Sequence, residues 1–184
     1  MVPDTQRLFL ALWPDEEVRT RLLKAAATPE RRQGGRGIEP GNLHLTIVFL
    51  GSTDSARRAC VERLASAIEA NPFTLIVDQL GYFRRTQVLW VGASSTPAEL
   101  LSLASNLNAA IPECGFAPER RELRPHVTLA RKVISGPRSP MAVEPIEWRV
   151  GDFCLVESVT GRTGAQYRVL RTWPLKSAAS QPAA

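Results

Sequence analysis

The chain has 184 residues, of which 44% are hydrophobic and 22% are charged, and its formal net charge is +5. This length and balance fit a single globular domain with a sizeable core and exclude a disordered or fibrous chain. The positive charge makes a polyanionic partner such as RNA plausible, because clustered Lys and Arg side chains attract phosphate groups before any specific contact forms.

The first half of the chain is predicted to alternate strands and helices. An apolar strand at 7–13 is followed by Pro14 and three acidic residues, which favour the start of a helix that runs to about residue 27. Residues 28–41 contain Pro, Gly and Arg and are expected to form a mobile basic loop. The next predicted elements are a strand at 43–50 that ends at Gly51, a helix capped by residues 52–54, strands at 73–80 and 88–91, and a basic, aromatic connection at 81–85.

The second half is predicted to repeat this order. Its elements are a helix at 97–111, a strand at 123–130 with Pro125 near its start, a loop at 137–145, a strand at 148–156, a turn at 161–164 and a strand at 167–170. The similarity of the two halves suggests a duplication, which would give two lobes that face each other across a pseudo-twofold cleft. We expect one bilobal domain over residues 1–176 and a disordered tail over 177–184.

Cys60, Cys114 and Cys154 are odd in number, far apart in the sequence and free of C-x-x-C spacing. This pattern argues against a disulfide framework or a zinc site and predicts three buried or inert thiols in a reducing compartment. The apolar run at 8–13 is too short to span a membrane and is not followed by a signal-peptide cleavage site. We therefore expect a cytoplasmic protein without a membrane segment.

The only two histidines of the chain, His44 and His126, lie in the same local pattern, because Thr46 and Thr128 follow them two positions later. Threonine accounts for 12 of the 184 residues, so both histidines would have this neighbour by chance with a probability of about 0.4%. Residues i and i+2 of a strand share a face, and each predicted strand therefore presents an imidazole and a hydroxyl together.

Two such strands supply the groups that an in-line displacement at phosphorus requires. One neutral imidazole can accept a proton from the nucleophile, while a cationic one donates a proton to the leaving oxygen on the opposite side. The threonine hydroxyls can hold the non-bridging oxygens, whose charge must be stabilised. We therefore predict that His44, Thr46, His126 and Thr128 form a catalytic set.

Other interpretations of the same residues remain open. The histidines can be half-buried strand residues, with threonines that are simply good strand formers. A metal site is disfavoured because no H-x-H, H-x-x-x-H or nearby carboxylate pair completes a coordination set, so we expect neither metal nor cofactor. A G-x-S-x-G motif is absent, and the glycines at 34–37 lack the lysine and hydroxyl of a P-loop.

Four segments of the chain resemble one known family. They are HLTIVFLG at 44–51, HVTLAR at 126–131, RLFLALWP at 7–14 and LVESVTGRTGAQYRVLRTWPL at 155–175. Together they resemble the 2H phosphoesterase superfamily and, within it, the bacterial and archaeal RNA 2′,3′-cyclic phosphodiesterases, also called the LigT or 2′-5′ RNA ligase family. The resemblance covers nearly the whole chain outside the tail.

The resemblance implies an α+β fold in which two antiparallel-sheet lobes with outer helices surround a central cleft. It also implies metal-independent hydrolysis of RNA 2′,3′-cyclic phosphate ends to 2′-phosphomonoesters, with RNA carrying that terminus as the partner, no cofactor and a monomeric protein. By the same resemblance His44 is the proton donor and His126 the proton acceptor. The sequence itself does not order the two histidines, since the motifs are chemically equivalent.

Several further residues gain expected roles. The resemblance makes Arg131 a substrate-binding residue and gives Glu157, Ser158, Gly161 and Tyr167 structural roles. Trp13 stands where relatives often carry a smaller or polar residue, a departure that puts no catalytic assignment in doubt. Six arginines that precede the two motifs are candidates for a rim that holds RNA: Arg31, Arg32, Arg36, Arg120, Arg121 and Arg124. Three aromatic residues are weaker candidates for base stacking, because strand aromatics are mostly core: Phe9, Phe49 and Tyr82.

Three rival functions remain at this stage. The same site run in reverse would join a cyclic phosphate to a 5′-hydroxyl as a 2′-5′ RNA ligase, although water at about 55 M favours hydrolysis. A related enzyme would act on a small cyclic nucleotide. A protein that only binds RNA ends would need charge rather than neutral imidazoles, and its binding would depend strongly on salt.

Overall fold

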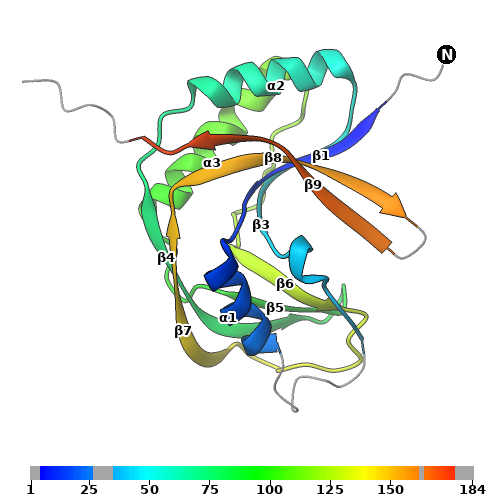
Figure 1. Ribbon diagram of the computed structural model, residues 1–184, viewed down its shortest axis with the longest axis vertical. Helices are drawn as coiled ribbons and strands as arrows, with labels where there is room; N and C mark the ends of the chain where they lie inside the picture. The colour runs from blue at the N-terminus through cyan, green and yellow to red at the C-terminus, as the bar shows by residue number, and fades with distance from the viewer. Residues whose placement is uncertain (1–4, 27–34, 162–163, 177–184) are drawn as a thin grey trace, which may run out of the picture.

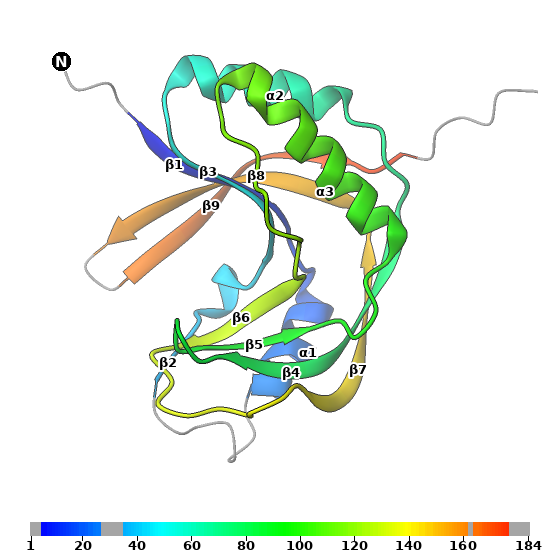
Figure 2. The same cartoon turned by 180° about the vertical axis from the view of Figure 1, so that it is seen from behind.

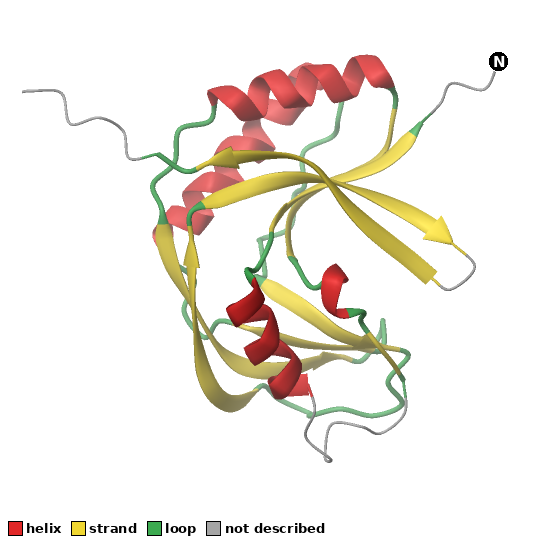
Figure 3. Ribbon diagram, viewed as in Figure 1, coloured by secondary structure: helices red, strands yellow, loops and turns green. Residues whose placement is uncertain are grey.

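The computed structural model describes residues 5–26, 35–161 and 164–176 and shows an α+β fold built on one antiparallel sheet (Figures 1 and 3). Its strands are β1 (Gln6–Leu12), β2 (Arg36–Gly37), β3 (Leu45–Thr53), β4 (Phe73–Phe83), β5 (Val88–Gly92), β6 (His126–Arg131), β7 (Met141–Val150), β8 (Asp152–Gly161) and β9 (Gly164–Pro174). Its helices are α1 (Glu16–Ala26), α2 (Ser55–Ala67) and α3 (Ala98–Ala110), with short 3-10 helices η2 (Pro40–Asn42) and η3 (Ile111–Cys114).

The order of the strands across the sheet is β7-β4-β5-β6-β3-β1-β8-β9, and the short β2 also pairs with β6. The two strands that carry the histidine motifs, β3 and β6, therefore meet at the centre. They are joined by a single antiparallel bridge between Leu45 and Val127. Four strands of this order lie on each side of the junction, so the expected α+β fold with two antiparallel lobes is confirmed, and the lobes are the two halves of one sheet.

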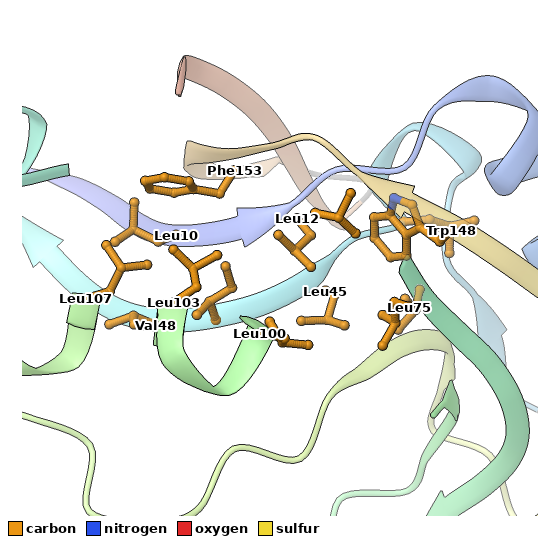
Figure 4. Close-up of a cluster of buried hydrophobic side chains, with 14 of the residues drawn as sticks. Leu10, Leu12, Leu45, Val48, Leu75, Leu100, Leu103, Leu107, Trp148 and Phe153 are labelled. Carbon is orange, nitrogen blue, oxygen red and sulfur yellow. The ribbon is translucent and has the colours of Figure 1, made fainter. Parts of the chain in front are cut away.

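Leucines on one face of the sheet form the centre of the core. α2 and α3 lie side by side over the half that contains β1, β3, β8 and β9, whereas α1 packs beside β6 and β7 (Figures 1 and 2). Leu100 and Leu103 of α3 are fully buried and face Leu45 of β3 (Figure 4). Burying one such leucine stabilises the fold by about 1.5–3 kcal/mol. Because Leu45 points into this core, the residues next to it in the sequence point to the opposite face of the sheet.

The helix starts follow the capping expected from the sequence. Asp15 Oδ1 accepts a hydrogen bond of 2.8 Å from the backbone N–H of Val18 at the start of α1. Asp54 Oδ1 does the same for Arg57 at the start of α2, also at 2.8 Å. Each bond satisfies a backbone donor that has no partner within its own helix.

Several predicted boundaries are wrong. The strand predicted at 43–50 is β3, which begins only after His44, and the strand predicted at 123–130 begins at His126. The strand predicted at 167–170 is the longer β9. The loop expected at 137–145 is shorter, because β7 begins at Met141 and includes Pro145. A proline is tolerated there since β7 is the last strand of the sheet and one of its sides has no strand partner among the described residues. The single strand predicted at 148–156 is divided by Gly151 between β7 and β8, and the connection predicted at 81–85 is strand up to Phe83.

The basic loop expected at 28–41 is partly structured. Arg36 and Gly37 form β2, and residues 40–42 form η2 just before the first motif. The rest of that loop, up to residue 34, lies outside the described residues, as does the tail predicted at 177–184. Lys176 precedes that tail and forms an isolated bridge with Ala70.

Two of the three cysteines form a disulfide, so the prediction of three thiols is wrong. Cys60 of α2 is bonded to Cys114 of η3 across a sequence separation of 54, with the Cα atoms 5.6 Å apart. An odd count and the absence of C-x-x-C spacing exclude neither a long-range pair nor one unpaired residue, and the fold brings α2 and η3 together. Cys154 is a buried thiol as expected, and burial raises its pKa to about 12.

Candidate active site

The four residues of the two motifs lie on one face of the sheet, which we call the histidine face. Leu45 and Val127, which form the central bridge, are each 1% exposed and point into the core. Side chains alternate along a strand, so their neighbours point to the other face. Continuing the antiparallel register by one residue in each direction sets His44 opposite Thr128 and Thr46 opposite His126.

Both imidazoles are anchored in the same way. The Nδ1 atom of His44 is 2.7 Å from the backbone oxygen of Asn42, and that of His126 is 2.7 Å from the backbone oxygen of Arg124. A carbonyl oxygen only accepts hydrogen bonds, so Nδ1 carries the proton in each ring. Each neutral imidazole is thus held in the tautomer that leaves Nε2 as the nitrogen that can accept a proton.

His44 lies among three aromatic rings. The Trp13 ring is nearly parallel to the imidazole, at an angle of 13° with 5.7 Å between centroids. Phe9 is 4.8 Å away and tilted, and Tyr167 meets the imidazole edge-on at 4.9 Å. The His44 Nε2 atom is 3.1 Å from the hydroxyl oxygen of Thr46. Three rings and one hydroxyl therefore fix the position of this imidazole.

His126 has fewer aromatic neighbours. Phe83 meets its ring edge-on at 5.0 Å, and Trp90 lies farther away at 6.3 Å. Trp90 in turn lies over Gly81, where an added Cβ would be 2.0 Å from an atom of the indole ring. Glycine at position 81 thus leaves the space that the Trp90 indole occupies next to His126.

The free protein holds both histidines in the neutral form at pH 7. Burial lowers the pKa of His44 from 6.5 to about 4, and the charges of Arg131 and His126 add to this effect. Burial also lowers the pKa of His126, and the charge of Arg131 contributes. The hydrogen bonds to the backbone oxygens favour the protonated forms but do not outweigh burial.

A bulge in β6 brings Arg131 to the histidine face. Arg131 lies five residues after His126, and in a regular strand an odd separation would put it on the opposite face. The pairing of β6 with β5 shifts by one residue, which leaves Leu129 as an extra residue. Arg131 then pairs with Val88, two residues from Trp90, and the ring of Trp90 contacts His126. The predicted substrate-binding arginine therefore lies beside both histidines.

The structure describes four of the six arginines proposed for an RNA rim, and these four have different surroundings. Arg36 pairs with Arg131 across β2 and β6. Arg121 forms an exposed ion pair with Glu119, and Arg124 contributes its backbone oxygen to His126. Arg120 is exposed, and residues 31 and 32 lie outside the described residues.

The aromatic candidates differ in exposure. Phe9 is buried at 4% exposure and contacts His44, whereas Phe49 is 72% exposed. The Tyr82 hydroxyl donates a hydrogen bond of 2.7 Å to the backbone oxygen of Val133, which suits a structural role. Glu157 is also structural, because it accepts hydrogen bonds from Gln6 and Arg168 on the neighbouring strands.

The sequence did not reveal the role of Asn42. Its backbone oxygen accepts the His44 bond, while its side chain donates to the backbone oxygen of Ala165 at 2.8 Å and accepts from the N–H of Tyr167 at 3.0 Å. Asn42 therefore ties η2 to β9 and holds Tyr167 against His44. Its position two residues before His44 matches that of Arg124 before His126, and this repeated spacing is the only signal in the sequence.

Across the described ranges, no group of three or more His, Cys, Asp or Glu side chains is arranged to hold a metal ion.

Comparisons with known proteins agree with this arrangement. The model of the 2′-5′ RNA ligase superfamily matches residues 14–162. The RNA 2′,3′-cyclic phosphodiesterase of Escherichia coli is 31% identical over 172 residues, which cover 94% of this chain and 98% of that protein. The RNA 2′,3′-cyclic phosphodiesterase of Thermus thermophilus is 34% identical over 181 residues, which cover 92% of this chain and 90% of that protein.

Solved structures show the same likeness in three dimensions. The crystal structure of Escherichia coli LigT in apo form has a TM-score of 0.83 at 30% identity and covers 94% of this chain and 99% of that one. The structure of the same protein complexed with 3′-AMP has a TM-score of 0.86 at 30% identity and covers 95% of this chain and 100% of that one. The fold, the two motifs and the family match lead to one conclusion: the chain belongs to the 2′-5′ RNA ligase superfamily.

Proposed function

We propose that this protein hydrolyses 2′,3′-cyclic phosphates at the 3′ ends of RNA to 2′-phosphomonoesters, without a metal ion, by acid-base catalysis. The observation that carries the proposal is that both histidines lie where β3 meets β6, each next to a residue of the central bridge and each with Nδ1 bonded to a backbone oxygen. The names of the relatives support the same reaction class. One relative of known structure was crystallised with 3′-AMP, a ribonucleotide with a terminal phosphate.

The reaction breaks the P–O3′ bond and forms a bond from phosphorus to the oxygen of water. His126 Nε2 removes a proton from the attacking water, and His44 Nε2 donates a proton to O3′ as it leaves. The product carries a 2′-phosphate and a 3′-hydroxyl, and proton exchange with solvent restores both rings. Thr46, Thr128 and Arg131 stabilise the charge on the non-bridging oxygens during displacement.

The assignment of His44 as donor is supported by its surroundings. An imidazolium whose pKa is lowered is a stronger acid, so it transfers its proton to a poor leaving group more readily. His44 is neutral in the free protein at pH 7, since its pKa is about 4. A bound phosphodiester anion beside the ring raises that pKa, because an opposite charge favours the charged form.

The proposal extends to the organisation of the protein. Residues 1–176 act as a single bilobal and monomeric unit, and RNA with a 2′,3′-cyclic phosphate terminus is the partner. No helix in the described part of the chain is long and apolar enough to cross a membrane. The Cys60–Cys114 disulfide removes the cysteine-based argument for a reducing compartment. A cytoplasmic location therefore stays a proposal that cell fractionation tests.

The direct test is incubation of the purified protein with an oligoribonucleotide ending in a 2′,3′-cyclic phosphate, in EDTA, with the product identified by phosphorus NMR. The expected product is the 2′-phosphomonoester. A 3′-phosphomonoester would overturn the assigned direction of ring opening. Tight binding without any product would favour a protein that only binds RNA ends.

A further inference from the structure

We propose that Arg36, which lies opposite Arg131, forms a second phosphate site that binds the internucleotide phosphate next to the cyclic end. This inference rests on the proposed function and names the substrate class as an RNA chain rather than a free cyclic nucleotide. It follows from the pairing of β2 with β6, from the charge of the two side chains and from the position of Arg36 next to β9.

The register places the two arginines side by side. Arg36 pairs with Arg131 in the antiparallel bridge between β2 and β6. Residues that face each other across such a bridge point to the same face of a sheet. Since the bulge in β6 puts Arg131 on the histidine face, Arg36 lies on that face as well, one strand farther from His126.

Two arginines thus occupy directly opposite positions on neighbouring strands. Like charges directly opposite on neighbouring strands destabilise a sheet, and a carboxylate nearby would normally offset the cost. The ion pairs found among the described residues all involve other arginines, so neither Arg36 nor Arg131 has a carboxylate partner there. A phosphodiester oxygen would supply the missing negative charge, and guanidinium is well suited to bind it.

The two arginines differ in their relation to the reacting phosphate. The bulge in β6 puts Arg131 on the histidine face, two residues along β5 from Trp90 beside His126, and the proposed mechanism assigns it to the cyclic phosphate. Arg36 lies one strand spacing beyond, about 4.8 Å farther across the sheet. A phosphate that Arg36 binds is therefore not the reacting one, and the proposal assigns it to the next phosphate along the RNA chain.

The guanidinium group of Arg36 also has a defined position in the structure. An added Cβ at Gly164 would be 3.3 Å from both terminal nitrogens of the Arg36 guanidinium, so this group lies against the first residue of β9. The same end of β9 is tied to η2 through Asn42 and Ala165. The Arg36 side chain thus reaches from β2, which pairs with β6, to the first residue of β9, next to the residues that hold η2.

The test compares adenosine 2′,3′-cyclic phosphate with the dinucleotide ApA ending in the same cyclic phosphate. Arg36→Gln should lower kcat/KM for the dinucleotide about tenfold and leave that for the mononucleotide unchanged. The dependence of log kcat/KM on log salt concentration should lose about one unit of slope for the dinucleotide. Arg36→Lys should retain most of the activity because it keeps the charge. Arg149→Gln is the matched control, since Arg149 is an exposed arginine on β7 that pairs with Glu147.

A neutral methylphosphonate linkage in the dinucleotide identifies the group that Arg36 binds. Wild-type protein should lose about tenfold with this linkage, and Arg36→Gln should lose nothing more. Equal losses on the mononucleotide and the dinucleotide would overturn the second site, as would a full effect of Arg36→Gln on the neutral linkage. If wild-type protein turns over neither substrate, the proposed function fails, and binding of ApA 2′-phosphate measured by calorimetry still decides the role of Arg36.

Discussion

The site has two half-sites, His44 with Thr46 and His126 with Thr128, which share a sequence motif and a backbone anchor but differ in their surroundings. His44 has three aromatic neighbours and a contact with Thr46, whereas His126 has Phe83 and a more distant Trp90. Chemically equivalent residues can therefore have different proton affinities, because burial and neighbouring charges set the pKa. In the proposed mechanism, this difference allows one histidine to donate a proton and the other to accept one.

Removing either imidazole should have the largest effect on turnover, because the proposed reaction needs both half-sites. His44→Asn and His126→Asn should each lower kcat by about 10²–10⁴-fold, which is the usual contribution of a general acid or base. The double variant should be little worse than either single variant, since the two groups act in one step. Steady-state rates with a cyclic-phosphate oligonucleotide give the values, and circular dichroism confirms folding. Full activity in either variant would contradict the mechanism.

The pH profile should reveal that the two histidines must be in opposite protonation states. Both pKa values are lowered in the free protein, so above pH 6.5 the protonated fraction of the donor falls tenfold for each pH unit. The value of kcat/KM, which reports the free protein, should therefore fall about 100-fold between about pH 6.5 and 8.5. The value of kcat should fall less, because the bound phosphate raises the pKa of the donor. A kcat/KM that rises over this range would exclude the proposed protonation states.

The two threonines should not be equivalent. Thr46→Val removes both a donor for the phosphate and the hydroxyl next to His44 Nε2, and we expect a loss of about tenfold in kcat. Thr128→Val removes a hydroxyl for which no such contact with a histidine exists in the described structure, so its loss should be about threefold. Valine keeps the shape of threonine in both cases. A larger loss at Thr128 would reverse the assigned difference between the half-sites.

Replacing Trp13 should make the pKa values of the two histidines more alike. Trp13→Ala should admit water to the His44 ring and raise its pKa from about 4 toward 6.5, because burial is the main cause of the lowered value. The pKa of His126 should change much less. Since the chain has only two histidines, their ring signals can be titrated by NMR and assigned with the His126→Asn variant. An unchanged His44 pKa would show that Trp13 does not exclude water from this ring.

Removing the disulfide between α2 and η3 tests whether turnover at the two half-sites depends on this bridge. Replacing Cys60 and Cys114 with Ser should lower the free energy of unfolding by about 2–4 kcal/mol, since the bridge closes a long loop. Turnover at room temperature should stay within about twofold, because neither cysteine lies on the histidine face. Cys154→Ala serves as a control that leaves the bridge intact. A large loss of turnover in the folded double variant would mean that the helical layer positions the site.

The placement of the four proposed catalytic residues could be predicted because it depends on local rules. Alternation along a strand puts His44 with Thr46 and His126 with Thr128, whatever the rest of the fold is. The helices α2 and α3 could likewise be predicted, from capping residues and from the spacing of leucines. Arg131 was reached through the family resemblance alone, since its odd separation from His126 indicates the wrong face until the bulge at Leu129 is known.

The remaining features depend on contacts between distant segments. The Cys60–Cys114 bridge requires α2 and η3 to be adjacent, and no spacing rule covers 54 residues. Trp13 and Tyr167 reach His44 from segments near opposite ends of the chain. The pairing of Arg36 with Arg131 arises from a two-residue strand that the sequence indicated only as a loop. Single residues that act through such contacts have no periodic pattern to reveal them.

The most direct test of which histidine is the acid and which is the base uses a cyclic substrate in which sulfur replaces the bridging O3′. A thiolate leaves without being protonated, so the reaction with this substrate needs a base but no acid. The account predicts that His44→Asn hydrolyses the sulfur substrate within about tenfold of the wild-type rate, while His126→Asn remains inactive. Rescue of His126→Asn instead would exchange the two roles, and rescue of neither variant would contradict acid-base catalysis by these two histidines.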